Sequence, residues 1–158
     1  MDRGSVDSGQ MDSDQLARLA AEACDDRKAV DIQMIRVDAV SSLADWFVIC
    51  SGLSDVQVRA IARSVEDRLE LEASRLPRGK EGQREGHWVL LDYGELIVHV
   101  LTARDRQYYD LEAFWGHGER VPFVGSVAAL TADSLPARAH GSGLPVNTLS
   151  GAGEPAAP

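Results

Sequence analysis

The order of apolar and polar positions predicts a chain in which helices and strands alternate. Residues 31–37 (DIQMIRV) alternate apolar and polar side chains, as a half-buried strand does, and residues 46–50 form a continuous apolar run typical of a central strand that ends at Gly52. Before them, a helix over residues 13–28, with Ser13 as its N-cap, is predicted by a shared apolar face: Leu16, Leu19, Ala20, Ala23 and Cys24.

A long helix, a loop, a hairpin and a last helix are predicted after the strand that ends at Gly52. Ser54 or Asp55 is expected to cap a long helix, whose apolar face is formed by Val58, Ile61, Ala62, Val65 and Leu69. Residues 74–86, rich in glycine and charge, are expected to form a loop. A hairpin follows, with strands at 88–92 and 95–101 and a turn at 93–94. A last helix is predicted to end at Gly116, with an apolar face formed by Tyr108, Leu111, Phe114 and Trp115.

The second hairpin strand has apolar residues on both faces, so both faces of the sheet must be covered. The order of elements predicts an α/β fold, a single small domain with a mixed β-sheet flanked by helices. We expect a disordered leader over residues 1–11, the domain over residues 12–116, and a flexible tail rich in Gly, Pro and Ala over residues 117–158.

The net charge of the chain argues against direct nucleic-acid binding. The 158 residues include 16 Lys and Arg against 25 Asp and Glu, a net charge of −9, and most of the acids lie within the predicted domain. A protein that binds nucleic acid directly needs a basic face, so the expected partner is a basic protein surface. No signal peptide or membrane span is visible, and Cys24 and Cys50 are interpreted as buried reduced thiols of a cytoplasmic protein, although a disulfide between them stays open.

Candidate catalytic chemistry is sparse. His99 lies among apolar strand residues without a second histidine at a metal-binding spacing, which favours a core or interface group over a general base or ligand. Residues 50–55 (CSGLSD) lack the glycine pattern of a Walker loop or a Rossmann turn. Asp92 has no second acid two residues away for metal-assisted phosphoryl transfer. We therefore predict no catalytic residue, cofactor site or metal site.

Several joined motifs resemble the ribosome silencing factor family, also called Iojap-like or YbeB-like. They are DWFVICSG at 45–52, EG at 81–82, WVLLDYGELIVHVL at 88–101, and the R-x-Y-Y-D-L-E-x-F-W pattern at 106–115. The resemblance covers roughly residues 12–116. It implies a nucleotidyltransferase-like fold without catalytic acids. It also implies binding to ribosomal protein uL-fourteen on the large ribosomal subunit, which blocks joining of the small subunit and lowers translation under nutrient limitation. Family members are often homodimers, and we expect one here.

The expected partner-binding residues are Asp92, Tyr93, Gly94 and Glu95 at the hairpin tip, with Trp88, Tyr108, Tyr109 and Trp115 in the same motifs. The helical spacing of Tyr108 and Trp115 also fits a core role, and the two acids also fit solvated turn residues. Two other functions stay open: a nucleotidyltransferase-like, nucleotide-binding enzyme that uses residues 50–55 and Asp92, and a dimeric scaffold without a ribosomal role.

Overall fold

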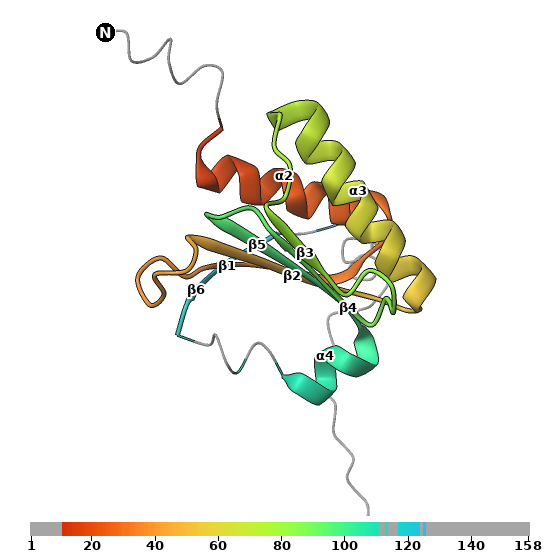
Figure 1. The fold of residues 1–158 in the computed structure, drawn as a ribbon. Helices are drawn as coiled ribbons and strands as arrows, with labels where there is room; N and C mark the ends of the chain where they lie inside the picture. Colours follow the sequence, from red (N-terminus) through yellow and green to blue (C-terminus); the bar gives the residue numbers. More distant parts are fainter. Residues whose placement is uncertain (1–10, 111–112, 114–116, 124, 126–158) are drawn as a thin grey trace, which may run out of the picture.

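The structure is a computed structural model that describes residues 11–110, 113, 117–123 and 125. Three layers are visible in Figure 1: α2 and α3 on one face of a twisted sheet, the sheet itself, and α4 on the opposite face. The elements are α2 (Ser13–Asp26), β1 (Val30–Arg36), β2 (Trp46–Gly52), α3 (Asp55–Ala73), β3 (Gly79–Glu81), β4 (Trp88–Asp92), β5 (Leu96–Thr102), α4 (Ala103–Tyr109) and β6 (Glu119–Val121).

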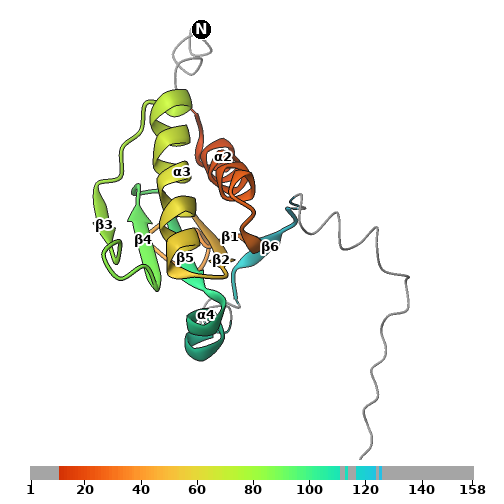
Figure 2. The same ribbon diagram turned by 90° about the vertical axis from the view of Figure 1, so that its right-hand side faces the viewer.

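The sheet has the strand order β3-β4-β5-β2-β1-β6, with the short strands β3 and β6 at opposite edges (Figure 2). The central strands β2 and β5 are parallel, and the other neighbouring pairs are antiparallel. This confirms the predicted α/β fold with a mixed sheet. The chain leaves β2 toward α3 on one face and leaves β5 toward α4 on the other (Figure 1).

The core is divided by the sheet into two apolar clusters. All seven residues of β2 are buried, as its continuous apolar run predicts. On β5, Leu96, Val98 and Val100 join the large cluster beneath α2 and α3. Ile97 and Leu101 face the opposite side and join the smaller cluster. The prediction of full cover is therefore met on the face beneath α2 and α3, whereas Trp88, Leu90 and Ile97 on the opposite face are only half-buried.

Cys24 and Cys50 are free, buried thiols in the large cluster. A hydrogen bond with the Cys50 thiol, together with burial, raises the pKa of Cys24 well above its ordinary value. A thiol that stays protonated is a weak nucleophile, so Cys24 behaves as a packed core group. The burial of both free thiols agrees with the sequence prediction.

The first helix begins differently from the prediction. Its N-cap is Asp12 and not Ser13. The Asp12 carboxylate accepts the Gln15 N–H at 2.8 Å, and the Gln15 side chain accepts the Asp12 N–H at 3.2 Å. This reciprocal pair is a capping box, which satisfies two backbone donors at once. The Ser54 alternative for α3 is confirmed, because its hydroxyl accepts the Gln57 N–H at 3.1 Å.

Three predicted boundaries are wrong. The expected loop at 74–86 contains β3, which pairs with β4. The predicted last helix is interrupted, since α4 ends at Tyr109 and Asp110 adopts a left-handed conformation, and most of residues 111–116 lie outside the described part of the chain. The tail expected from residue 117 contributes β6, which pairs with β1 through Met34 and Val121.

Several expectations lie outside the described residues: the remainder of the leader and of the tail, and the side chains of Leu111, Phe114 and Trp115. Within the described part of the chain, no helix has the length and apolar character needed to cross a bilayer.

Candidate functional site

A continuous chain of ring contacts runs from the core to the surface beside α4. Phe47 lies 5.2 Å from His99, and His99 lies 6.0 Å from Trp88, measured between ring centroids. Trp88 lies 5.0 Å from Tyr109, which meets Tyr108 edge-on at 4.9 Å. Tyr109 is 52% exposed and Tyr108 is 80% exposed. We call Trp88, Tyr108 and Tyr109 the aromatic patch.

The orientation of α4 explains why the two tyrosines face outward. The Thr102 hydroxyl caps the helix by accepting the Asp105 N–H at 3.2 Å. Arg106 points inward instead of an apolar residue: it is 6% exposed, and its guanidinium donates to the Asp31 carbonyl at 2.7 Å and to the Ser51 hydroxyl at 3.1 Å. Because this arginine holds the helix against the sheet, the neighbouring tyrosines are left on the outer side.

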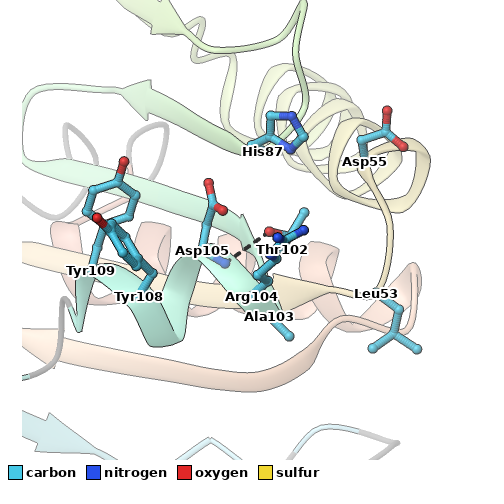
Figure 3. A pocket seen from close by; sticks show the side chains of 9 residues that line it. All are labelled: Leu53, Asp55, His87, Thr102, Ala103, Arg104, Asp105, Tyr108 and Tyr109. Atoms are coloured by element: carbon cyan, nitrogen blue, oxygen red, sulfur yellow. Dashed lines mark hydrogen bonds between the residues drawn. The ribbon is translucent and has the colours of Figure 1, made fainter.

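A crevice of about 740 Å³ borders the aromatic patch at the carboxyl ends of β2 and β5 (Figure 3). Two parallel strands whose connections leave to opposite faces create such a crevice in open α/β sheets. The Asp105 carboxylate points into it, and this residue forms no ion pair within the described part of the chain. The lining residues are Leu53, Asp55, His87, Thr102, Ala103, Arg104, Asp105, Tyr108 and Tyr109.

The hairpin tip forms a separate group whose polar side chains have partners within the chain. Glu95 makes a two-pronged ion pair with Arg75, at 2.7 and 2.9 Å, and the same guanidinium donates to the Tyr93 carbonyl at 2.7 Å. The hydrogen bond from Arg75 lowers the pKa of Glu95. Asp92 accepts the Gly94 N–H at 2.8 Å and faces Arg78 at 3.3 Å. These acids therefore have structural roles in the turn.

Two details of the tip differ from the sequence prediction. The Tyr93 N–H donates to the Leu96 carbonyl, so the two-residue loop is Gly94–Glu95 and not Tyr93–Gly94. Gly94 has a φ of +94°, which favours glycine. The Tyr93 side chain is only 3% exposed, and burial raises the pKa of its phenol. A partner cannot reach this ring in the observed conformation.

The seven expected partner-binding residues that the structure describes thus lie in two groups. Trp88 begins β4 and Asp92 ends it, which separates the aromatic patch from the tip by roughly 13 Å along the strand. The structure brings together Trp88, Tyr108 and Tyr109. It places the tip at the other end of the hairpin, and Trp115 lies outside the described residues.

His99 is a hydrogen-bonded core group. It is 6% exposed, and its Nδ1 accepts the Trp88 indole N–H at 3.1 Å. Burial lowers the pKa of His99 to about 4, so the ring is neutral at pH 7. No cluster that could hold a metal ion occurs among the described residues. The sequence analysis missed the bond to Trp88, although Leu90 pairs with His99 and Trp88 is therefore its diagonal neighbour on the same face.

The turn at residues 50–55 is poorly suited to hold a phosphate. Two backbone donors at this strand-to-helix connection are already used: Leu53 N–H bonds to Gln57 Oε1 at 2.7 Å, and Val56 N–H bonds to Asp55 Oδ1 at 2.9 Å. Gly52 allows close packing of the helix, because an added Cβ would lie 3.0 Å from Val58.

The two parts of the enzyme hypothesis also lie at opposite ends of the sheet. Asp92 is level with Phe47 through their common neighbour Ile97, whereas Gly52 is level with Thr102. Phe47 and Gly52 are five residue steps apart along β2, which separates these levels by roughly 17 Å. Asp92 and the 50–55 turn are therefore too far apart to form one active site, and this geometry disfavours the nucleotidyltransferase-like alternative.

The fold and site define a small α/β protein with an exposed aromatic surface on a rigid sheet. Residues 10–143 match the family model described as ribosomal silencing factor during starvation. The chain is 42% identical over 106 residues to the ribosomal silencing factor of Bacillus subtilis, covering 67% of this chain and 89% of that protein. It is 31% identical over 97 residues to the chloroplastic protein Iojap of Zea mays, covering 61% of this chain and 42% of that protein. The chain belongs to the ribosomal silencing factor family.

Solved structures agree with this assignment. A crystal structure of a Chromobacterium violaceum protein, 38% identical, superimposes with a TM-score of 0.65 and covers 72% of this chain and 92% of that one. A Bacillus halodurans structure, 34% identical, gives a TM-score of 0.62, with 70% and 99% covered. The resemblance stated from the motifs is therefore confirmed. The matching family model and the Bacillus subtilis relative are named as silencing factors and not as enzymes.

Proposed function

We propose that this protein lowers translation by docking on the large ribosomal subunit and covering the surface that the small subunit would contact. The carrying observation is the aromatic patch, in which exposed Tyr108 packs on exposed Tyr109, and Tyr109 packs on Trp88, whose indole is bonded to the buried His99. Exposed aromatic side chains with little freedom to move are well suited to dominate binding energy at an interface. A bound domain of this size blocks a second large particle sterically, without chemistry.

The chemistry of the surface favours a basic protein partner, and ribosomal protein uL-fourteen is the partner that family resemblance suggests. The chain carries a net charge of −9, and the crevice beside the patch contains Asp55 and Asp105 against one arginine. A lysine or arginine of the partner would meet the Asp105 carboxylate and the faces of Tyr108 and Tyr109 together. We infer a cytoplasmic location from such a partner.

Co-sedimentation with purified large subunits tests the proposal. Tyr109→Ala is expected to weaken binding at least about tenfold, because it removes an exposed ring from the centre of the patch. Leu71→Ala is the matched control: Leu71 is a large, 81% exposed apolar residue on α3, away from the patch. In a subunit-joining assay, Tyr109→Ala should likewise inhibit joining of the two subunits less than Leu71→Ala does. Equal binding by both variants would place the docking surface elsewhere, with the hairpin tip as the next candidate.

We also propose that the free protein is a homodimer. Large apolar side chains are exposed beside the face of the sheet opposite α2 and α3. Leu43, at 66%, lies in the β1–β2 connection, whose Val37 and Ala44 belong to the smaller cluster, and Tyr108 and Tyr109 extend from α4. A second copy is the commonest cover for such a surface. Light scattering at micromolar concentration should give twice the chain mass, and a monomer mass across that range would contradict this proposal.

A further inference from the structure

We infer that His99 is a positioning residue of the docking surface: it fixes the indole of Trp88, and through it the ring of Tyr109, in the orientation that a partner meets. The inference depends on the proposed function for what the surface binds. Its geometric part depends only on the buried histidine and the two rings beyond it.

The contacts form a direct line from the core to the surface. The Trp88 indole N–H donates to His99 Nδ1 at 3.1 Å, while the indole ring lies 5.0 Å from the ring of Tyr109. An indole has one N–H proton, so this bond uses its whole hydrogen-bonding capacity. A change in the acceptor therefore acts first on Trp88 and then on Tyr109.

The acceptor itself cannot move easily. His99 is in β5, between β4 and the fully buried β2, and its ring packs 5.2 Å from Phe47. Trp88 is held less firmly, because β3 forms ladder pairs only with residues 90–92 of β4, so the outer side of the strand at Trp88 has the turn at Gly82 beside it and not a paired strand. The less restrained Trp88 side chain is thus hydrogen-bonded to His99, whose position is fixed by the core.

The arrangement also defines which substitutions preserve it. Acceptance at Nδ1 requires the ring proton to be on Nε2, so the histidine acts as a neutral acceptor. In His99→Asn, the side-chain oxygen lies close to the position of Nδ1 and can accept the indole proton. In His99→Leu, the core is filled by an apolar side chain but the acceptor is lost. Leucine also removes the buried Nε2, which has no hydrogen-bond partner among the described residues.

The variants are measured by affinity for purified large subunits, by melting temperature, and by the NMR signal of the Trp88 indole N–H. We expect His99→Leu to keep its melting temperature, to bind about tenfold more weakly, and to lose protection of the indole proton from exchange. His99→Asn should stay near wild-type affinity. A double-mutant cycle with Trp88→Phe, which lacks the N–H, should show that the two losses are not additive.

Two results would overturn the inference: wild-type affinity in His99→Leu, or equal weakening in both variants in proportion to a lower melting temperature, which shows a purely structural residue. Failure of the proposed function looks different, since the unmodified chain would then not bind large subunits at all. The NMR signal still decides the geometric part in that case, because an indole proton that exchanges equally fast in the wild type and His99→Leu contradicts the bond.

Discussion

Acidification is expected to destabilise the domain, and His99 supplies a part of the effect that can be calculated. Burial lowers the pKa of His99 from 6.5 to about 4 in the folded chain. Between these pH values the unfolded chain binds a proton that the folded chain excludes, so protonation favours unfolding. The contribution is fully present above pH 6.5 and is lost as the pH falls toward 4.

The magnitude follows from the size of this shift. A difference of 2.5 pKa units (6.5 minus 4), at 1.36 kcal/mol per unit, gives about 3 kcal/mol for a group that is almost completely buried. Such a loss is a large fraction of the stability of a small domain. His99→Asn removes the titrating group, so its free energy of unfolding should fall less steeply over the same pH range.

Urea unfolding of the two proteins, in steps of about half a pH unit from neutral pH to about 4, measures the difference directly. Other groups cancel in the comparison. Glu95 acts mainly at lower pH, because its pKa is lowered from 4.5 and its contribution is lost only as the pH falls through the lowered value. If the wild type and His99→Asn lose free energy in parallel between pH 6.5 and 4, burial of His99 does not have the effect deduced from the structure.

Three further changes have defined outcomes. Gly82→Ala should lower the free energy of unfolding by about 2 kcal/mol in urea, because its φ is +87° and an added Cβ would overlap a carbonyl oxygen of β4. Ser54→Ala removes the acceptor for the Gln57 N–H and should cost about 1 kcal/mol in the same assay. Asp105→Asn should weaken binding to large subunits severalfold and make it less salt-dependent, whereas Asp38→Asn, a change at an exposed acid away from the patch, should leave binding unchanged.

The parts of the fold with strong periodicity could be predicted from the sequence. The apolar run of β2 and the apolar face of α3 depend on side chains that alternate or recur within one element. Strands β3 and β6 could not be predicted, because each has three residues and is defined by backbone pairing with a distant segment. No side-chain pattern records that pairing.

The candidate site was less accessible to sequence reasoning. Helical spacing alone also suggested a core position for Tyr108. In the structure Tyr108 is 80% exposed, because the residue of α4 that faces inward is a charged one, Arg106. A prediction from apolar spacing assigns an arginine to the surface, so it predicted the wrong buried face for this helix. The partners of the two tip acids, Arg75 and Arg78, lie in a segment predicted to be a loop, so their ion pairs were invisible as well.

The tip and the aromatic patch are separate in space but connected through strand register. The Arg75–Glu95 pair holds the turn, and the turn fixes which residues of β4 and β5 are opposite one another, including the diagonal pair Trp88 and His99. A slip of one residue would move His99 to the other face. Reversing the charge of residue 95 alone, by Glu95→Arg, should therefore weaken ribosome binding whether the tip docks directly or only supports the patch.

A charge exchange separates the two cases. Glu95→Arg combined with Arg75→Glu restores an ion pair at the same place with reversed polarity. If the tip only supports the patch, the double variant should recover most of the stability and most of the binding that Glu95→Arg alone loses. If the tip docks directly on a basic partner, stability recovers but binding does not, because an arginine now faces that partner. Recovery of stability without binding would therefore move the docking surface from the aromatic patch to the hairpin tip.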